Sequence, residues 1–125
     1  MTGATGPEFR VGQGFDVHRF SNDPDRRLVL GGCHFPDMPG LEGHSDADAV
    51  AHACADALLG AAGLGDIGMH FPDTDPLWEG ADSMTLLRHV ATLIAEEGWR
   101  QLKRSLNVDG RTDRGVITHD SIRLH

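Results

Sequence analysis

The chain has 125 residues and a mass of 13.5 kDa, with 39% hydrophobic and 24% charged residues, the size and composition of one globular domain. Its net charge of −8 argues against non-specific binding to nucleic acid, which depends on Lys and Arg neutralising phosphates. No apolar run approaches transmembrane length and the N-terminus does not resemble a secretory signal, so we expect a cytoplasmic protein without membrane or nucleic-acid partners.

The first predicted elements are two short strands. Residues 1–9 carry Gly, Thr and Pro without periodicity, so we expect a flexible or expression-derived leader outside the fold. A strand is predicted over about residues 10–17 and a second over about residues 28–30, which residues 33–35 could continue. Because side chains two apart in a strand project to the same side, Asp16 and His18 are expected to converge on one point while Val17 faces the core.

A helix is predicted from an N-cap at Ser45 to residue 62. At about 100° per residue, Asp48, His52 and Asp56 share one face of this helix within roughly 80°. The opposite face is apolar and is expected to be buried; it carries Val50, Ala53, Cys54, Ala57, Leu58 and Ala61. The polar face is then free to line a cleft, whereas the alternative interpretation is a solvated acidic face with an incidental histidine.

Asp16, His18 and His52 together offer one carboxylate and two imidazoles to a divalent metal. This donor set suits Zn(II), and Mn(II) or Fe(II) would also accept it. Three protein ligands leave a fourth position open, as in catalytic or substrate-orienting sites, and we favour zinc. Asp48 and Asp56 are assigned to packing or to supporting the ligands, because a metal-bound histidine usually needs an acceptor for its other ring nitrogen.

Turns and one further helix are predicted next. Residues 63–68 form a glycine-rich loop whose backbone can approach a ligand closely, or which simply ends the preceding helix. Residues 71–76 contain two prolines that stiffen the backbone. A second helix is predicted from a cap at Asp82 or Ser83 to a stop at Gly98, with a buried stripe of Met84, Leu87, Val90, Ala91 and Ile94.

The composition changes at about residue 100. Residues 101–125 carry five basic and three acidic residues, a net charge of +2, whereas residues 1–100 carry six basic and sixteen acidic residues, a net charge of −10. Val116, Ile117 and Ile122 could occupy a short strand, but the segment offers little apolar surface to bury. We therefore divide the chain into a domain at residues 10–100 and a divergent, loosely ordered tail at residues 101–125.

Five sequence blocks fall in the order and spacing of one enzyme family: GFDVH at 14–18, LEGHSDAD at 41–48, ALLGAA at 57–62, LGDIG at 64–68 and FPDTDP at 71–76. From about residue 11 to residue 99 the chain resembles the 2-C-methyl-D-erythritol 2,4-cyclodiphosphate synthases of the non-mevalonate pathway of isoprenoid (terpenoid) biosynthesis. The resemblance implies a single α+β domain with a small mixed sheet covered by helices on one face. It also implies a homotrimer with active sites between neighbouring subunits.

The implied reaction is an intramolecular phosphoryl transfer catalysed by a phosphorus-oxygen lyase. The 2-phosphate of 4-diphosphocytidyl-2-C-methyl-D-erythritol 2-phosphate attacks the β-phosphorus of the diphosphate, giving the cyclic 2,4-diphosphate and CMP. Such chemistry depends mostly on positioning and on neutralising phosphate charge. The resemblance implies one zinc per subunit, a cytidine diphosphate-linked substrate, and Mg(II) bound with the substrate diphosphate.

Individual positions match the functional residues of the family. Asp16, His18 and His52 match its zinc ligands, and Asp16 and His18 are also assigned to the substrate site. His44 and Ser45 match the phosphate-contacting pair, with His44 as the transition-state stabiliser, beside a helix N-terminus expected to donate N–H groups to phosphate. The remaining matches form the ribose-binding loop and the wall around the methylerythritol unit: Asp66, Ile67, Gly68, Phe71, Pro72, Asp73, Thr74 and Asp75.

Residues 101–125 depart from the family pattern. They offer no counterpart to the cytosine-binding loop or to the Thr-Thr-Glu segment, whose Glu would hold magnesium. Two hypotheses follow. The first is the cyclodiphosphate synthase itself, and the second is a non-catalytic relative that binds zinc or nucleotide without turnover.

Overall fold

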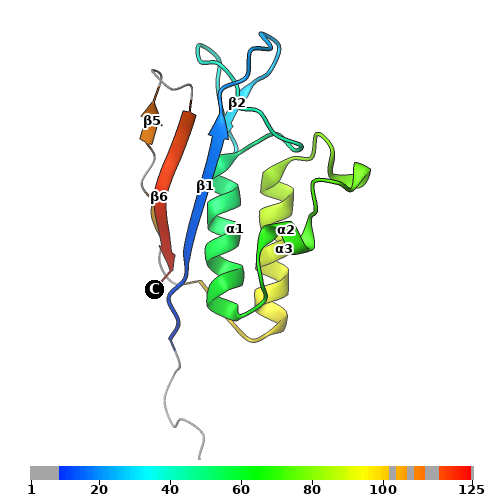
Figure 1. Cartoon of the computed structure of the whole chain (residues 1–125). Coiled ribbons are helices and arrows are strands. Elements are labelled where there is room, and N and C mark those ends of the chain that lie inside the picture. Colours follow the sequence, from blue (N-terminus) through cyan, green and yellow to red (C-terminus); the bar gives the residue numbers. More distant parts are fainter. Residues whose placement is uncertain (1–8, 102–103, 107–108, 112–115, 125) are drawn as a thin grey trace, which may run out of the picture.

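A four-stranded sheet, one central helix and one outer helix make up the body of the molecule (Figure 1). The computed structural model describes residues 9–101, 104–106, 109–111 and 116–124, with side chains for residues 9–101. The four-stranded sheet contains β1 (Gln13–Arg19), β4 (Arg104–Leu106), β5 (Asp109–Arg111) and β6 (Val116–Leu124). Helix α1 (Ala49–Ala62) packs on β1 and β6, and α3 (Ser83–Glu96) packs on α1. The helices therefore cover one face of the sheet, as expected.

Strand β6 is the centre of the sheet. It pairs with β1 along one edge, and with β4 and β5 along the other. All these pairings are antiparallel, so the expectation of a mixed sheet is wrong for the strands that the structure describes. Connection length requires this for β5 and β6, because only four residues separate them and a parallel pair needs a crossover of a dozen or more.

The segment expected to be a loosely ordered tail contributes three strands of the sheet. Strand β6 has nine residues, and Gln13 of β1 lies opposite Arg123 while His18 lies opposite Ile117. Backbone pairing, which needs no apolar surface, brings this segment into the fold. The expectation based on its low apolar content was therefore wrong. Most of the predicted leader lies outside the described residues.

Strand β1 lies close against α1 because it presents glycine to that helix. It runs over Gln13–Arg19 rather than 10–17. A Cβ atom on Gly14 would come 1.9 Å from the carbonyl oxygen of Ala53, and one on Gly12 would come 2.0 Å from that of Ala57. The pairing register with β6 shifts between Gly14 and Asp16. Tight contact and this irregularity place Asp16 beside the helix.

Alternation along β1 sends Asp16 and His18 toward α1, so Val17 cannot face the core. Val17 is 44% exposed and its neighbour Phe15 is 58% exposed. The expectation of a buried Val17 was wrong because the polar residues occupy the side of the strand that the helix covers.

A hairpin of β2 (Leu28–Leu30) and β3 (Cys33–Phe35) forms a separate two-stranded sheet. The predicted second strand has the observed bounds, and residues 33–35 form its antiparallel partner rather than its continuation. Gly31 and Gly32 turn the chain with φ of 62° and 79°. Their N–H groups both donate to the carboxylate of Asp48, at 2.8 and 2.7 Å, which fastens the hairpin to α1.

Helix α1 begins at Ala49 with Asp48 as its N-cap, not with Ser45. Ala47, fully buried, has a φ of 57°, a left-handed conformation that interrupts the chain between Ser45 and the helix. Asp48 accepts a hydrogen bond from the N–H of Ala51 at 3.0 Å. The alanine-rich face of α1 packs against α3 in the main core, whose buried members include Ala53, Ala57, Leu58, Leu59, Phe71, Leu86, Val90 and Ile94.

Helix α3 has the predicted start, with Asp82 as its N-cap, and Gly98 follows its end with a φ of 85°. Its buried stripe is Ser83, Leu86, Val90 and Ile94. Ala91, predicted to be buried, is exposed, because Leu86 rather than Ala91 faces α1. Between the two long helices lie α2 (Ile67–His70) and the short 3₁₀ helix η1 (Pro76–Trp78), which replace an irregular loop. No helix in the described part of the chain has the length and apolar character needed to cross a membrane.

Candidate metal centre and adjoining cavity

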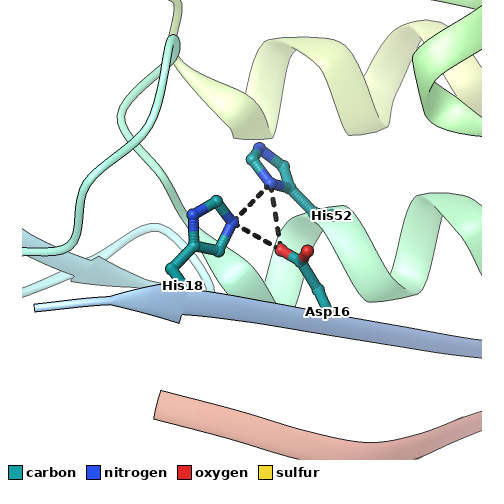
Figure 2. A group of neighbouring side chains, drawn as sticks. All are labelled: Asp16, His18 and His52. Carbon is teal, nitrogen blue, oxygen red and sulfur yellow. Dashed lines mark hydrogen bonds and ion pairs between the residues drawn. The ribbon is translucent and has the colours of Figure 1, made fainter. Parts of the chain in front are cut away.

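The three predicted metal ligands come together between β1 and the first turns of α1 (Figure 2). Oδ2 of Asp16 lies 2.7 Å from Nε2 of His18 and 3.2 Å from Nδ1 of His52, and the two ring nitrogens are 3.3 Å apart. All three residues are half-buried. A strand period of two and a helix that runs alongside the strand bring one carboxylate oxygen and two ring nitrogens to one point.

The geometry of the cluster fits a tetrahedral metal. Zinc binds nitrogen and oxygen ligands at about 2.0–2.1 Å, so the edge between two tetrahedral ligands is roughly 3.3 Å. Two of the three edges here are 3.2 and 3.3 Å, and the third, between Asp16 and His18, is a hydrogen bond. A metal would need only a small opening of that edge, and it would keep one vertex for another ligand.

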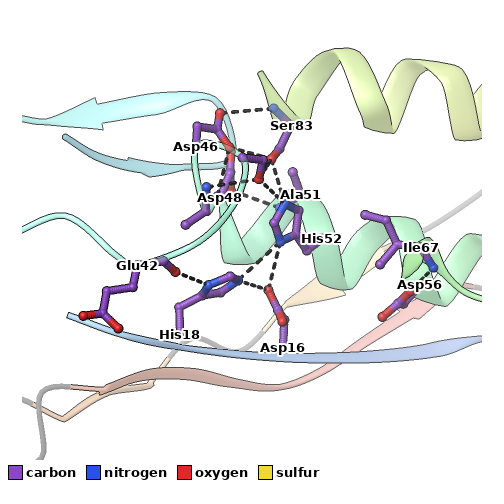
Figure 3. Close-up of polar contacts among 12 residues, drawn as sticks. Asp16, His18, Glu42, Asp46, Asp48, Ala51, His52, Asp56, Ile67 and Ser83 are labelled. Carbon is purple, nitrogen blue, oxygen red and sulfur yellow. Dashed lines mark hydrogen bonds and ion pairs between the residues drawn. The ribbon is translucent and has the colours of Figure 1, made fainter. Parts of the chain in front are cut away.

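The outer nitrogen of each histidine is held by a hydrogen bond (Figure 3). Nδ1–H of His18 donates to the backbone carbonyl of Glu42 at 2.7 Å, so the lone pair that Nε2 gains when it gives up the proton shared with Asp16 faces the cluster. Nε2 of His52 lies 2.7 Å from Oγ of Ser83, and its Nδ1 faces the cluster. Both rings are thus oriented as ligands.

The electrostatics of the cluster favour an ionised Asp16. Burial by itself raises the pKa of the Asp16 carboxyl. The hydrogen bonds that His18 and His52 make to it, together with their positive charge, outweigh burial and lower the pKa to about 2. Burial lowers the pKa of His18, and its hydrogen bond with Asp16 and that residue's charge outweigh burial and raise the pKa. The site therefore presents a carboxylate anion at any physiological pH.

Asp48 and Asp56 were assigned either to packing or to supporting the metal ligands, and their hydrogen bonds fit the packing alternative. The carboxylate of Asp48 is fully buried among three backbone N–H groups at the start of α1. Asp56 accepts a hydrogen bond from the N–H of Ile67 at 2.7 Å, and burial raises its pKa. Backbone donors satisfy both carboxylates, and Ser83 rather than either aspartate contacts the outer nitrogen of His52.

A cavity of about 390 Å³ adjoins the metal cluster. Eight of the residues predicted to bind substrate or metal line it together with His52: His18, His44, Ser45, Ile67, Gly68, Phe71, Pro72 and Asp73. Gly43, Trp78 and Leu86 also line the cavity and were missed. Trp78 could have been predicted as a cavity residue, because it is an aromatic residue two positions after Pro76 at the end of the predicted substrate segment. For Leu86, the helical period indicated burial but gave no sign of a place in the cavity.

Four predicted substrate residues do not line this cavity, and one of them, Asp16, lies in the metal cluster beside it. Asp66 caps α2 through a hydrogen bond from the N–H of Met69, and Thr74 is absent from the lining. Asp75 contributes indirectly: its backbone carbonyl lies 2.9 Å from Nε2 of His44. The helix N-terminus expected to face phosphate is occupied by the side chain of Asp48, so that expectation was wrong.

Arg26 shapes the loop that carries His44 and Ser45. Its guanidinium donates to the backbone carbonyls of Leu41, Gly43 and Ser45 at 2.7, 3.0 and 2.6 Å. Three carbonyls from alternate residues held by one rigid planar group fix the path of this loop beside the metal cluster.

The model of the YgbB family matches residues 9–114 of the chain. The chain belongs to the YgbB family. It is 59% identical over 101 residues to a 2-C-methyl-D-erythritol 2,4-cyclodiphosphate synthase of Dechloromonas aromatica, covering 81% of this chain and 59% of that protein. It is 60% identical over 98 residues to the synthase of Symbiobacterium thermophilum, covering 78% and 61%. This YgbB chain thus spans about three fifths of the length of these relatives.

A solved structure supports the same assignment. A 2C-methyl-D-erythritol-2,4-cyclodiphosphate synthase in its CDP-bound form matches this YgbB chain with a TM-score of 0.80 and 32% identity, covering 93% of this chain and 99% of that one. The small α+β fold predicted from the sequence is therefore that of the YgbB family.

Proposed function

We propose that this YgbB chain is a 2-C-methyl-D-erythritol 2,4-cyclodiphosphate synthase of isoprenoid biosynthesis, a phosphorus-oxygen lyase. The observation that carries the proposal is that the Asp16, His18 and His52 cluster, whose spacing suits a tetrahedral metal, adjoins a cavity lined by His44 and Ser45. Relatives of high identity carry the name of this synthase. The substrate would be 4-diphosphocytidyl-2-C-methyl-D-erythritol 2-phosphate. One non-bridging oxygen of its 2-phosphate would bond to the β-phosphorus as the bond to CMP breaks.

The metal proposed for the cluster is one zinc per subunit, with Mn(II) as the alternative. Bound there, zinc would supply a Lewis acid that polarises the phosphate under attack. Magnesium is proposed to bind together with the substrate diphosphate, as the resemblance to the synthase family implies. Residues 101–125 offer no counterpart to the usual magnesium-binding Glu of the family.

His44 and Ser45 would act on the phosphates directly. The hydrogen bond from Nε2–H of His44 to the carbonyl of Asp75 holds the imidazole and leaves Nδ1 for a substrate oxygen. Donation from Nδ1 requires the imidazolium form, whose charge would stabilise the transition state. The hydroxyl of Ser45 would contact a second oxygen. No protein nucleophile is needed.

The wall of the cavity suits a small branched polyol. Phe71 packs edge-to-face on Trp78 with ring centroids 4.9 Å apart, and Leu86 lies beside them. These apolar groups would receive the methyl group and exclude water from the reacting phosphates. Asp66, Ile67 and Gly68 are proposed to hold the ribose, and Pro72, Asp73, Thr74 and Asp75 the methylerythritol unit.

Assembly and location complete the proposal. We propose a homotrimer with active sites between neighbouring subunits, working in the cytoplasm on a cytidine diphosphate-linked small molecule. Partner residues could then supply groups that residues 101–125 do not provide. The competing hypothesis is a relative that binds zinc or nucleotide without turnover, and it is favoured by residues 101–125, which depart from the sequence pattern of the family.

Release of CMP tests the proposal. The purified chain, loaded with zinc, is incubated with the substrate and Mg(II), and CMP is measured by chromatography. We expect CMP formation that His44→Ala abolishes and that His34→Ala, on the exposed β3 strand, leaves unchanged. Binding of CDP without any CMP above the metal-free control would reject the synthase and support the non-catalytic relative.

A further inference from the structure

Ser83, the first residue of α3, contacts the outer nitrogen of a proposed metal ligand. We propose that Ser83 is a positioning residue for His52: its hydroxyl, anchored by Asp46, fixes the tautomer and the ring orientation that turn Nδ1 toward the metal. The inference rests on the metal site of the proposed function. It adds a residue of α3 to a cluster otherwise built by β1 and α1.

The side chain of Ser83 is enclosed at the point where α1 meets the start of α3. Its exposed fraction is 1%. Its Oγ lies 2.7 Å from Nε2 of His52, makes a short hydrogen bond to Oδ1 of Asp46, and lies 3.2 Å from Oγ of Ser45 (Figure 3). A buried hydroxyl with three polar neighbours has its single proton committed to one of them.

Asp46 decides the direction of these hydrogen bonds. Its carboxylate also accepts from the N–H of Asp48 and from the N–H of Ser83, each at 3.1 Å, so it is surrounded by donors. An ionised carboxylate has no proton to give, and the Ser83 hydroxyl must therefore donate to it. The oxygen of Ser83 is then left as an acceptor toward His52.

The consequence reaches the ring of His52. Nε2 must carry the proton to donate to Ser83, and in a neutral imidazole Nδ1 is then the atom with the free lone pair. Nδ1 is the nitrogen that lies 3.2 Å from Asp16 and 3.3 Å from His18. In many metal sites a carboxylate contacts the ligating histidine directly; here a hydroxyl stands between them.

Ser45 is the competing partner for the same nitrogen. Its Oγ lies 3.2 Å from Nε2 of His52, farther than Ser83, and it accepts a hydrogen bond from the N–H of Ala47 at 3.3 Å. Its own hydroxyl proton can be donated to Ser83, which keeps Ser83 acting as an acceptor for His52. Ser45 can therefore turn to a substrate phosphate without releasing the imidazole.

Zinc affinity of Ser83 variants tests the inference. Affinity is measured by competition with a chromophoric chelator on the full chain, and Co(II) substituted for zinc reports ligand geometry through its visible absorption. We expect Ser83→Ala to weaken zinc binding about 10- to 100-fold, the range for lost partners of metal-bound histidines, and to change the Co(II) spectrum. Ser83→Thr, which keeps the hydroxyl, should restore both. The matched control is Thr92→Ala, which removes an exposed hydroxyl bonded within α3.

A second measurement needs no variant. In the zinc-loaded chain, long-range ¹H–¹⁵N correlation of the His52 ring should show a proton on Nε2 and metal on Nδ1. The opposite assignment, or a Ser83→Ala chain with wild-type zinc affinity and Co(II) spectrum, would overturn the inference. A wild-type chain without zinc affinity would overturn the metal site as well, whereas zinc binding without CMP release would reject only the proposed turnover.

Discussion

At the scale of single residues, His52 is the ligand that joins the helix to the strand. Asp16 and His18 both come from β1, so loss of the His52 imidazole leaves two ligands from one element. We expect His52→Ala to weaken zinc binding more than about 100-fold, the upper range for loss of a partner that only supports a ligand. Elemental analysis after dialysis measures it, with His34→Ala as the control. Equal metal content in wild type and His52→Ala would contradict the ligand assignment.

The acid-base behaviour of Asp16 and His18 gives a second prediction at this scale. The lowered pKa of Asp16, about 2, contributes stability above pH 3.8 that is lost as pH falls through 2. The raised pKa of His18 contributes stability below pH 6.5 that is lost as pH rises through its folded value. In the metal-free chain, the stabilising effect of this pair should therefore be greatest between pH 3.8 and 6.5.

Urea unfolding with a chelator present, from pH 3 to pH 9, measures this dependence. The free energy of unfolding of wild type should exceed that of Asp16→Asn most within that window, and the difference should shrink above it as His18 loses its proton. A difference that does not change with pH would show that the two groups do not interact as the geometry indicates.

At the scale of elements, the contact between β1 and α1 sets the spacing of the metal ligands. Gly14 leaves no room for a Cβ atom beside the carbonyl of Ala53, so Gly14→Ala must push strand and helix apart. We expect it to cost about 2–3 kcal/mol, as overpacking does, and to weaken zinc binding by separating Asp16 and His18 from His52. The measurements are urea unfolding and chelator competition.

Gly60 of α1 provides the matched control. No atom lies within 4 Å of a Cβ built there, and the residue is exposed within the helix. Gly60→Ala should therefore stabilise the chain by about 0.5–1 kcal/mol and leave zinc affinity unchanged. If Gly14→Ala binds zinc as tightly as wild type, the contact between β1 and α1 does not set the spacing of the metal ligands.

Periodicity predicted the elements that hold the ligands because each ligand depends on local geometry. Asp16 and His18 share a side of one strand, and His52 lies on a helix whose apolar face can be recognised from the spacing of its hydrophobic residues. The start of α1 was misplaced because Ala47 adopts a left-handed conformation that an alanine does not signal. Ser83 could not be assigned from sequence, since its role depends on Asp46, 37 residues away. Strand β6 was underestimated because its place depends on pairing with β1.

At the scale of the whole molecule, strand β1 presents two exposed apolar side chains on the side away from the helices. They are Phe15 and Val17, which are 58% and 44% exposed. The proposed homotrimer would bury such residues, so we expect sedimentation equilibrium to give about three times 13.5 kDa. Phe15→Glu should lower the association constant, whereas Leu77→Glu, on exposed η1, should not. A monomer at micromolar concentration would contradict the trimer, and insensitivity to Phe15→Glu would place the contact on another surface.

The pairing of β1 with β6 also has a kinetic consequence. Gln13 and Arg123 lie side by side although 110 positions separate them, so this part of the sheet has a very high contact order. During synthesis, Asp16 and His18 leave the ribosome on a strand whose partner has not yet been made. Helix α1 can collapse onto the glycines of β1 in the meantime, but the strand keeps an open edge until residues 116–124 emerge. Early capture of zinc by the three ligands would hold β1 on α1 through that interval and shield the chain from aggregation.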